Sequence, residues 1–303
     1  MARSGAIPPQ PLVHCYKLVN PLNTVFLQIK GNNDMLYLKQ NISALKRKAL
    51  SQIGVWKPAG PNLTIRSTDT FIVSYPKSGN TWVRFLIGYL LKKQMLDFLT
   101  IEKTIPGLFQ NSDSELQKIK SPRFIKSHFM SANKYPKVLY IIRDPRDVAI
   151  SFYYWRMRHN SEFSKSGTTL QEYLEQFVVQ EVAYRNWDEH VNFWLDEAKN
   201  MNDNFKLIRY EDLKQNCFTT VSEMVSFLNI NCSPEDIQNA IRLTDLKNMR
   251  KAEQKNRATR KSKVPFCRKG TSGQWRDIFP AELNDKYCQK FGHLMDLFNY
   301  SHQ

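Results

Sequence analysis

The stretch FIVSYPKSGNTWVRFLIGYLL, from Phe71 to Leu91, joins an apolar run to a helix-like segment through the turn PKSGN. The run TFIVSY, residues 70–75, is short and rich in β-branched and aromatic side chains, as buried strands are. A helix is expected to begin near Asn80. The first N–H groups of a helix attract anions, and the helix dipole adds to this attraction. The stretch therefore predicts a strand, an anion-binding turn and a helix.

The order of residues in this turn differs from that of a nucleotide-triphosphate loop. Such a loop reads GxxxxGK(S/T), with lysine after the second glycine, whereas Lys77 precedes Gly79 here. Ser78 and Thr81 can donate hydroxyl hydrogen bonds, Gly79 permits close backbone approach, and Lys77 can place a positive charge beside a bridging oxygen. The structural alternative is an ordinary strand-to-helix turn with a helix cap.

Composition and charge limit the class of protein. The 303 residues suit one large α/β domain or two small ones, and we favour one. Lysine and arginine outnumber aspartate and glutamate by 44 to 28, which gives a formal charge of +16 and indicates an anionic partner. Five scattered cysteines without a CxxC pair indicate neither a disulfide framework nor a zinc site.

The N-terminal region is expected to be an extension, residues 1–68, packed on a single globular domain, residues 69–303. Prolines interrupt the first residues, and no apolar run approaches the roughly 20 residues that span a bilayer. We therefore expect no signal peptide, no transmembrane segment and a cytoplasmic location.

Strands alternate with helices along the rest of the chain, which predicts a P-loop-like three-layer α/β fold with a central, mainly parallel sheet flanked by helices. Ligands of such sheets bind at the carboxyl ends of the strands. A basic stretch, residues 253–275, is expected to be irregular. The predicted strands are 70–75, 137–143, 205–210 and, more weakly, 123–128; the predicted helices are 80–93, 145–158, 169–199 with a break, 213–229, 234–242 and 281–298.

A second site element follows the strand within LYIIRDPRDVAISFYYW, Leu139–Trp155. Arg143 ends this strand and Ser151 lies two turns into the next helix, so both can face one ligand. A guanidinium and a hydroxyl at this place suit a second phosphate group. The simplest interpretation leaves Arg146 and Asp147 in solvent.

Two further segments carry candidate groups. In FIKSHF, Lys126 and His128 lie two residues apart at a strand end and would share one side of the strand. A neutral imidazole there could accept a proton from a substrate hydroxyl or amine. In PFCRKGTSGQW, Arg268 and Lys269 stand between glycine-punctuated turns and could close over a phosphate. Taken singly, each has a structural alternative: a core histidine and a solvated basic loop.

Together, four segments resemble the sulfotransferases that use 3′-phosphoadenosine 5′-phosphosulfate (PAPS) over residues 70–280. They are YPKSGNTW, IIRDPRDVAISFYYW, IRYEDL and FCRKGTSGQW. The resemblance implies that the 5′-phosphosulfate is held by Lys77, Ser78, Gly79, Asn80 and Thr81, with Trp82 near the adenine. It implies that the 3′-phosphate is held by Arg143, Ser151, Arg268, Lys269 and Gly270, and that Tyr210 and Thr244 contact the nucleotide near its base. It also implies that the catalytic groups are His128, Lys126 and Lys77.

The chain departs from the family pattern at four places. Asn80 replaces the first threonine of the loop, Leu246 stands where an aromatic residue often follows the nucleotide-binding threonine, and Gln274 replaces the aspartate of GDW. The segment RDIFPAELND, Arg276–Asp285, only loosely resembles the family's dimerisation motif. We therefore predict no dimer of that type and leave the oligomeric state open.

The sequence thus predicts transfer of a sulfuryl group from PAPS to a hydroxyl or amine of a small-molecule or glycan acceptor by in-line displacement, with His128 as base. No metal is expected, because lysine and arginine supply the positive charge that magnesium supplies in kinases. A P-loop kinase or NTPase is an alternative that the position of Lys77 disfavours. A nucleic-acid-binding module is less favoured, since the basic run Arg250–Lys263 lacks interleaved aromatics. The identity of the acceptor stays open.

Overall fold

The computed structural model describes residues 49–52, 54, 56–130, 135–179, 185–257, 265 and 267–303. The chain divides into two units, residues 1–48 and residues 49–303, and the whole first unit lies outside the described residues. Most of the predicted N-terminal extension therefore lies outside them too. From its described end, Ala59 and Leu63 are buried in the core of the second unit.

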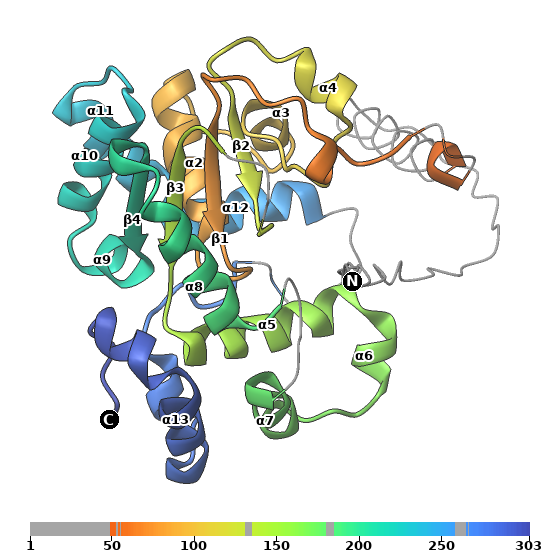
Figure 1. Cartoon of the computed structure of the whole chain (residues 1–303), viewed down its shortest axis with the longest axis vertical. Coiled ribbons are helices and arrows are strands. Elements are labelled where there is room, and N and C mark those ends of the chain that lie inside the picture. Colours follow the sequence, from red (N-terminus) through yellow and green to blue (C-terminus); the bar gives the residue numbers. More distant parts are fainter. Residues whose placement is uncertain are drawn as a thin grey trace, which may run out of the picture. The chain divides into compact units, whose positions relative to one another are not determined.

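Four parallel strands form the centre of the second unit (Figure 1). In spatial order they are β2 (Phe124–Ser127), β1 (Thr70–Ser74), β3 (Val138–Ile142) and β4 (Phe205–Arg209). Each lies within one of the runs predicted from the sequence, and the weakest of these runs forms the edge strand β2. Because the strands run in the same direction, their carboxyl ends meet at one edge of the sheet.

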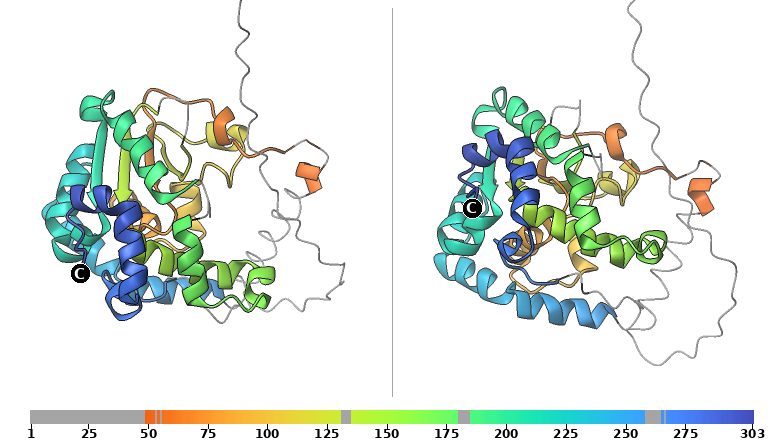
Figure 2. Two further views of the ribbon diagram at one scale, coloured as in Figure 1. Left: turned by 60° about the horizontal axis from the view of Figure 1, so that its bottom comes forward. Right: turned by 90° about the horizontal axis from the view of Figure 1, so that it is seen from below.

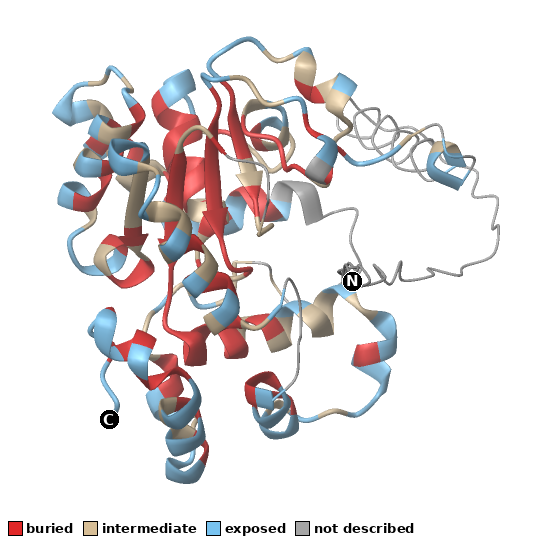
Figure 3. Cartoon of the chain, in the orientation of Figure 1, coloured by how far each residue is buried: buried red, intermediate tan, exposed pale blue. Residues whose placement is uncertain are grey.

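Side chains of the central strands alternate between two separate cores. In β1, Phe71 and Val73 belong to the first core and Ile72 to the second. In β3, Tyr140 packs in the first core and Leu139 in the second. Figure 3 shows that these strands are buried along their length. Burial on both faces explains why the strands read as continuous apolar runs, and it confirms the predicted three-layer α/β fold.

Helices supply the other side of each core (Figure 2). Those in the first core are α4 (Asp113–Gln117), α5 (Pro145–His159), α6 (Ser161–Lys165), α7 (Leu170–Val179), α8 (Trp187–Ala198) and α13 (Ala281–Leu297). Those in the second are α2 (Asn80–Lys92), α3 (Thr100–Thr104), α9 (Tyr210–Gln215), α10 (Cys217–Leu228), α11 (Pro234–Leu243) and α12 (Leu246–Arg257). Short 3-10 helices are η1 (Gly60–Asn62), η2 (Asn202–Asn204) and η3 (Gln274–Asp277).

One helix prediction was wrong, and α3, α4, α6 and α12 were not predicted. The predicted helix 213–229 is two helices, α9 and α10, because Asn216 between them has φ −126° and ψ 50°, outside the helical region. Helix α12 was not predicted, and its last residues fall in the stretch expected to be irregular. Its sequence LKNMRKAEQKNR is strongly polar, and its three apolar residues, Leu246, Met249 and Ala252, stand three positions apart, as on one face of a helix; Met249 and Ala252 are buried. So few apolar residues hide a helix among polar ones even when their spacing is helical.

A buried ion pair fixes the amino edge of the sheet. Arg123, directly before β2, donates from Nε and Nη2 to the two carboxylate oxygens of Asp69, directly before β1, at 2.7 and 2.5 Å. Both side chains have 0% exposure. Arg123 also donates to the carbonyls of Leu116 and Thr64. This arginine is thus neutralised by a carboxylate within the protein itself.

Candidate active site

The predicted site residues follow the carboxyl ends of all four strands. Lys77 comes after β1, His128 after β2, Arg143 after β3 and Tyr210 after β4. Since these ends share one edge of the sheet, the parallel topology brings together residues that lie more than 130 positions apart in the chain.

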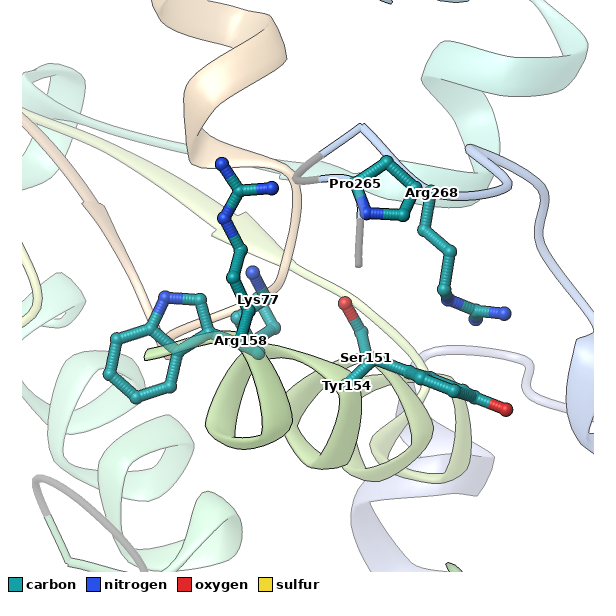
Figure 4. A pocket seen from close by; sticks show the side chains of 7 residues that line it. Lys77, Ser151, Tyr154, Arg158, Pro265 and Arg268 are labelled. Atoms are coloured by element: carbon teal, nitrogen blue, oxygen red, sulfur yellow. The ribbon is translucent and has the colours of Figure 1, made fainter. Parts of the chain in front are cut away.

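A pocket at this edge contains cations from three segments (Figure 4). In that view Ser151 and Arg158 project from α5 toward the segment that carries Pro265 and Arg268, with Lys77 close by. The pocket therefore brings three predicted residues together: Lys77, Ser151 and Arg268. Its other lining residues are Tyr154, Trp155, Arg158 and Pro265. The sequence singled out none of them, although the segment Phe152–Asn160, which contains the first three, is expected to help line the acceptor pocket. Their positions on α5, three, four and seven residues after Ser151, are the signal that could have found the first three.

Packing against Tyr210 explains the glycine of the turn. Gly79 has φ +100°, and a Cβ atom placed there would lie 2.5 Å from Cδ2 of Tyr210. Any other residue would be strained in its backbone and would collide with this ring. Ser78 is fully buried, and its Oγ has no hydrogen-bond partner among the described residues. A buried hydroxyl of this kind is rare unless a ligand completes its bonding.

The side chain of Asn80 points into the protein. Its Nδ2 donates to the carbonyl of Ile72 at 3.1 Å and to Oγ of Ser74 at 3.3 Å. The resemblance places Asn80 among the residues that hold the phosphosulfate, and these bonds hold its Nδ2 on β1. At the first position of α2, its backbone N–H remains the group suited to an anion. Thr81 follows and is half-buried.

Trp82 and Tyr210 form an aromatic wall beside the turn. Their rings meet edge to face at 6.0 Å, and the ammonium of Lys214 lies 5.2 Å from the ring centre of Trp82. The guanidinium of Arg143 lies 4.4 Å from the ring centre of Tyr210. Flat rings with cations beside them suit a purine base.

Arg143 and Asp147 link three segments. Arg143 donates to the carbonyls of Lys77 at 3.2 Å and Thr271 at 2.9 Å, and it pairs with Asp147 at 3.3 Å. The carboxylate of Asp147 accepts the backbone N–H groups of Gly273 at 2.8 Å and Trp275 at 3.2 Å. Asp147 therefore positions the segment that contains Arg268.

The expectation that Arg146 and Asp147 lie in solvent was wrong. They are 0% and 1% exposed. Arg146 donates to both carboxylate oxygens of Asp144, at 3.0 and 2.7 Å, and to Oδ1 of Asn284 at 2.7 Å. Its guanidinium also lies 3.4 Å from the ring centre of Trp275. Apart from Arg143 and Asp144, the named partners of these two residues lie 126 or more positions away in the chain, so local sequence could not indicate this burial.

Arg268, Lys269 and Gly270 differ in their relation to the pocket. Arg268 lies 4.3 Å from the ring centre of Tyr154 and donates to Oε1 of Gln274 at 2.5 Å. Gln274, which replaces the family's aspartate, thus holds Arg268 without neutralising it. Lys269 is exposed and does not line the pocket. Gly270 has φ +62° and packs against Leu246.

Thr244 lies at the end of α11 and has 0% exposure. Its hydroxyl donates to the carbonyl of Ala240 at 2.8 Å, so the hydroxyl hydrogen is used in a bond within α11. This arrangement gives Thr244 a structural bond in addition to the nucleotide contact that the resemblance implies.

The hydrogen bond of His128 identifies the nitrogen that can act as a base. Nδ1 lies 2.7 Å from the carbonyl oxygen of Ser74. A carbonyl only accepts, so in the neutral ring Nδ1 carries the hydrogen and Nε2 carries the lone pair. The backbone carbonyl of His128 in turn lies 3.2 Å from Nε2 of His190. The ring of His128 is therefore held through Nδ1, and its backbone is held through the carbonyl.

Burial and mutual repulsion shift the protonation of the three predicted catalytic groups. Burial, then the charges of Lys126 and Arg143, lower the pKa of Lys77 to about 7. Burial and Arg84 lower the pKa of Lys126 to about 8, against an opposing effect of Glu102. Burial and Lys126 lower the pKa of His128 well below its usual value, so its neutral form dominates at pH 7. Such a cluster favours an anionic ligand and supplies a neutral base.

Comparison with known proteins decides the family. The model of the sulfotransferase domain matches residues 67–299. This chain belongs to the sulfotransferase family. The dog sulfotransferase 1B1 is 31% identical over 73% of this chain and 81% of its own length. The human sulfotransferase 1E1 is 29% identical over 75% of this chain and 83% of its own length. The sulfotransferase is therefore an enzyme, as its four sequence segments predicted.

Solved structures agree with this fold. A mouse sulfotransferase, SULT7A1, complexed with PAP has 25% identity, covers 78% of this chain and 87% of that one, and superposes with a TM-score of 0.61. A retinol dehydratase in complex with androsterone and PAP has a TM-score of 0.66 over 78% of this chain and 83% of that one, at 20% identity. Membership of the family favours sulfuryl transfer over the kinase, NTPase and nucleic-acid-binding alternatives. In the part of this sulfotransferase that the structure describes, no helix is long and apolar enough to cross a membrane.

Proposed function

We propose that this sulfotransferase moves a sulfuryl group from PAPS to a hydroxyl or amine of a small-molecule acceptor, with His128 as the base. The observation that carries the proposal is the pocket in which Lys77, Ser151 and Arg268 converge at the strand ends. His128, which follows β2 at the same edge of the sheet, has a neutral imidazole at pH 7 because burial lowers its pKa. Lys77 and Lys126 lie at the end where the acceptor would react, and Arg143, Ser151 and Arg268 at the end where the 3′-phosphate would bind.

The groups at the turn suit the phosphosulfate end of PAPS. The unpartnered hydroxyl of Ser78 and the first N–H groups of α2 can donate to its oxygens. Lys77 can stabilise the negative charge that develops on the oxygen between phosphorus and sulfur, because a preorganised cation acts strongly in a site that excludes water. PAPS supplies the sulfuryl group itself.

His128 would take the proton that the acceptor loses. Its Nδ1–H bond to Ser74 directs Nε2 away from the strand, and its lowered pKa keeps the ring neutral and able to accept a proton. Lys126, two residues earlier on β2, would stabilise charge beside it. These roles follow the expectations drawn from the sequence.

For the acceptor we propose a small molecule with a hydroxyl group. A guinea-pig relative that is 30% identical, over 75% of this chain and 84% of its own length, is named 3-beta-hydroxysteroid sulfotransferase. That name concerns the relative and supports only the class of acceptor. A glycan acceptor remains the alternative outcome of an acceptor screen.

The test is the substitution His128→Ala. Transfer of labelled sulfate from PAPS to a panel of hydroxylated and amino acceptors should fall by about 10²–10⁴-fold, the usual contribution of a positioned base. Affinity for PAP, the nucleotide left after transfer, should change less than about two-fold, because His128 carries no positive charge that a phosphate would use. If the wild-type protein transfers no sulfate and is not stabilised by PAP, the proposed function is wrong. If the variant loses PAP affinity as strongly as activity, the role of His128 is wrong.

A further inference from the structure

Arg158 is a cation of the pocket to which the sequence assigned no role. It lies seven residues after Ser151 on α5 and lines the same pocket as Ser151 and Lys77 (Figure 4). Its side chain is 3% exposed and pairs with Glu253 of α12, Nη1 to Oε1, at 2.9 Å. Burying a guanidinium is costly even when it is paired, so its place beside Lys77 points to a function.

Glu253 fixes the orientation of this guanidinium, and it is itself held by the backbone. Its second carboxylate oxygen accepts the backbone N–H of Cys267 at 3.0 Å. One turn earlier on α12, Arg250 donates to the carbonyls of Cys267 and Arg268. The carboxylate that orients Arg158 is therefore itself tied to the segment that forms the opposite wall of the pocket.

Arg158 belongs to the Lys77 end of the pocket. Its positive charge is among those that lower the pKa of Lys77, together with Lys126 and Arg143. Arg268 bonds Gln274 and stacks on Tyr154, and burial and, among the cations, Arg143 lower its pKa. Arg158 thus stands with Lys77, and Arg143 lies between the Lys77 end and the Arg268 end of the site.

We propose that Arg158 binds the sulfuryl group of the donor opposite Lys77, and that Glu253 is its positioning residue. This inference rests on the proposed function. Arginine has five N–H donors in a rigid fork, so one guanidinium can bond a carboxylate and an anion through different edges.

In the transfer, a bond forms from the acceptor oxygen or nitrogen to sulfur while the bond from sulfur to the bridging oxygen breaks. The electron pair of the broken bond stays on the phosphate beside Lys77, and the acceptor proton goes to His128. Arg158 would donate to the sulfuryl oxygens that take part in neither bond, so it acts on PAPS and not on PAP.

The experiment compares PAPS with PAP in Arg158→Gln. Without acceptor, equilibrium affinity for PAPS should fall about 10- to 100-fold, the range for losing a charge-assisted hydrogen bond. Affinity for PAP, which lacks the sulfuryl group, should change less than about two-fold. An equal loss for both nucleotides, or no loss for either, would overturn the inference. A wild-type protein that binds neither nucleotide would instead overturn the proposed function.

Three further variants separate binding from structure. Arg156→Gln removes the same charge from α5, but Arg156 lies against the ring of Phe163 at 4.2 Å, so the ratio of PAPS to PAP affinity should not change. Arg158→Lys keeps the positive charge but loses the forked set of N–H donors, so it should lower the ratio of PAPS to PAP affinity partially. This variant replaces Arg158→Gln in the test if Arg158→Gln does not fold. Glu253→Gln should lower the ratio too, since Arg158 loses its orientation. A ratio unchanged in both Arg158→Lys and Glu253→Gln would contradict the assignment.

Discussion

At the amino edge of the sheet, Arg123 is fully buried and bonds both carboxylate oxygens of Asp69. At the carboxyl edge, burial and then the charge of Lys126 lower the pKa of Lys77 to about 7, and burial and then the charge of Arg84 lower the pKa of Lys126 to about 8. Arg268, in the same pocket as Lys77, is held by a neutral amide, that of Gln274. The same residue types therefore stand in opposite electrostatic environments at the two edges.

The difference separates a structural cation from a functional one. Arg123 uses its donors on one carboxylate and two backbone carbonyls, and removing that carboxylate costs stability. Where cations crowd together at the carboxyl edge and lower the pKa of Lys77, an anion from outside would stabilise the charged form. Arg143 and Arg158 combine both environments, because each pairs with a carboxylate and also lies beside Lys77.

The strongest test of this comparison is at the amino edge. Asp69→Asn would leave the guanidinium of Arg123 buried without a negative charge and should lower the free energy of unfolding by about 3–5 kcal/mol. Chemical denaturation would measure it. The matched control is Asp196→Asn, which breaks an exposed pair with Lys199 and should cost less than about 1 kcal/mol. Equal effects of the two substitutions would show that the amino-edge pair is not a structural anchor.

At the carboxyl edge, removing a cation should affect binding more than stability. Arg268→Gln is expected to weaken PAP binding by about 1.5–3 kcal/mol, the range for a hydrogen bond to a charged group, because a guanidinium donor to the 3′-phosphate is lost. The free energy of unfolding should change by less than about 1 kcal/mol, since no carboxylate is left unpaired. Calorimetric titration and denaturation would measure both. Loss of stability without loss of affinity would assign Arg268 to the fold.

The smallest expected effect is a change in proton uptake at Lys77. Its pKa is about 7 without ligand, and a bound anion raises the pKa of a neighbouring amine. PAP binding should therefore take up a fraction of a proton, about one at most, between pH 7 and 8, and affinity should fall as pH rises through this range. Calorimetry in buffers of different ionisation enthalpy measures the uptake. Lys77→Arg should reduce the proton uptake to the part contributed by Lys126, whose pKa is about 8. Equal uptake in both proteins would contradict the assignment.

Local pattern was sufficient to predict the fold and three of the seven residues that line the pocket. Apolar runs revealed all four strands because each is short and at least partly buried, and the turn at Lys77 showed where α2 begins. The helix α12 escaped prediction because its packing depends on few apolar residues. Arg158 and Tyr154 escaped because a charged or aromatic residue on a helix reads as surface or core until its neighbours are known.

By itself, the sequence determined the four strands, the turn from which α2 begins and membership of the sulfotransferase family, since each of these depends on residues close together in the chain. Tertiary structure alone decided which charges are neutralised. Asp147 reaches Gly273 across 126 positions, and Glu253 reaches Arg158 across 95. An ionisable group acquires its role from the charges and the burial around it, and these come from segments that only folding brings together.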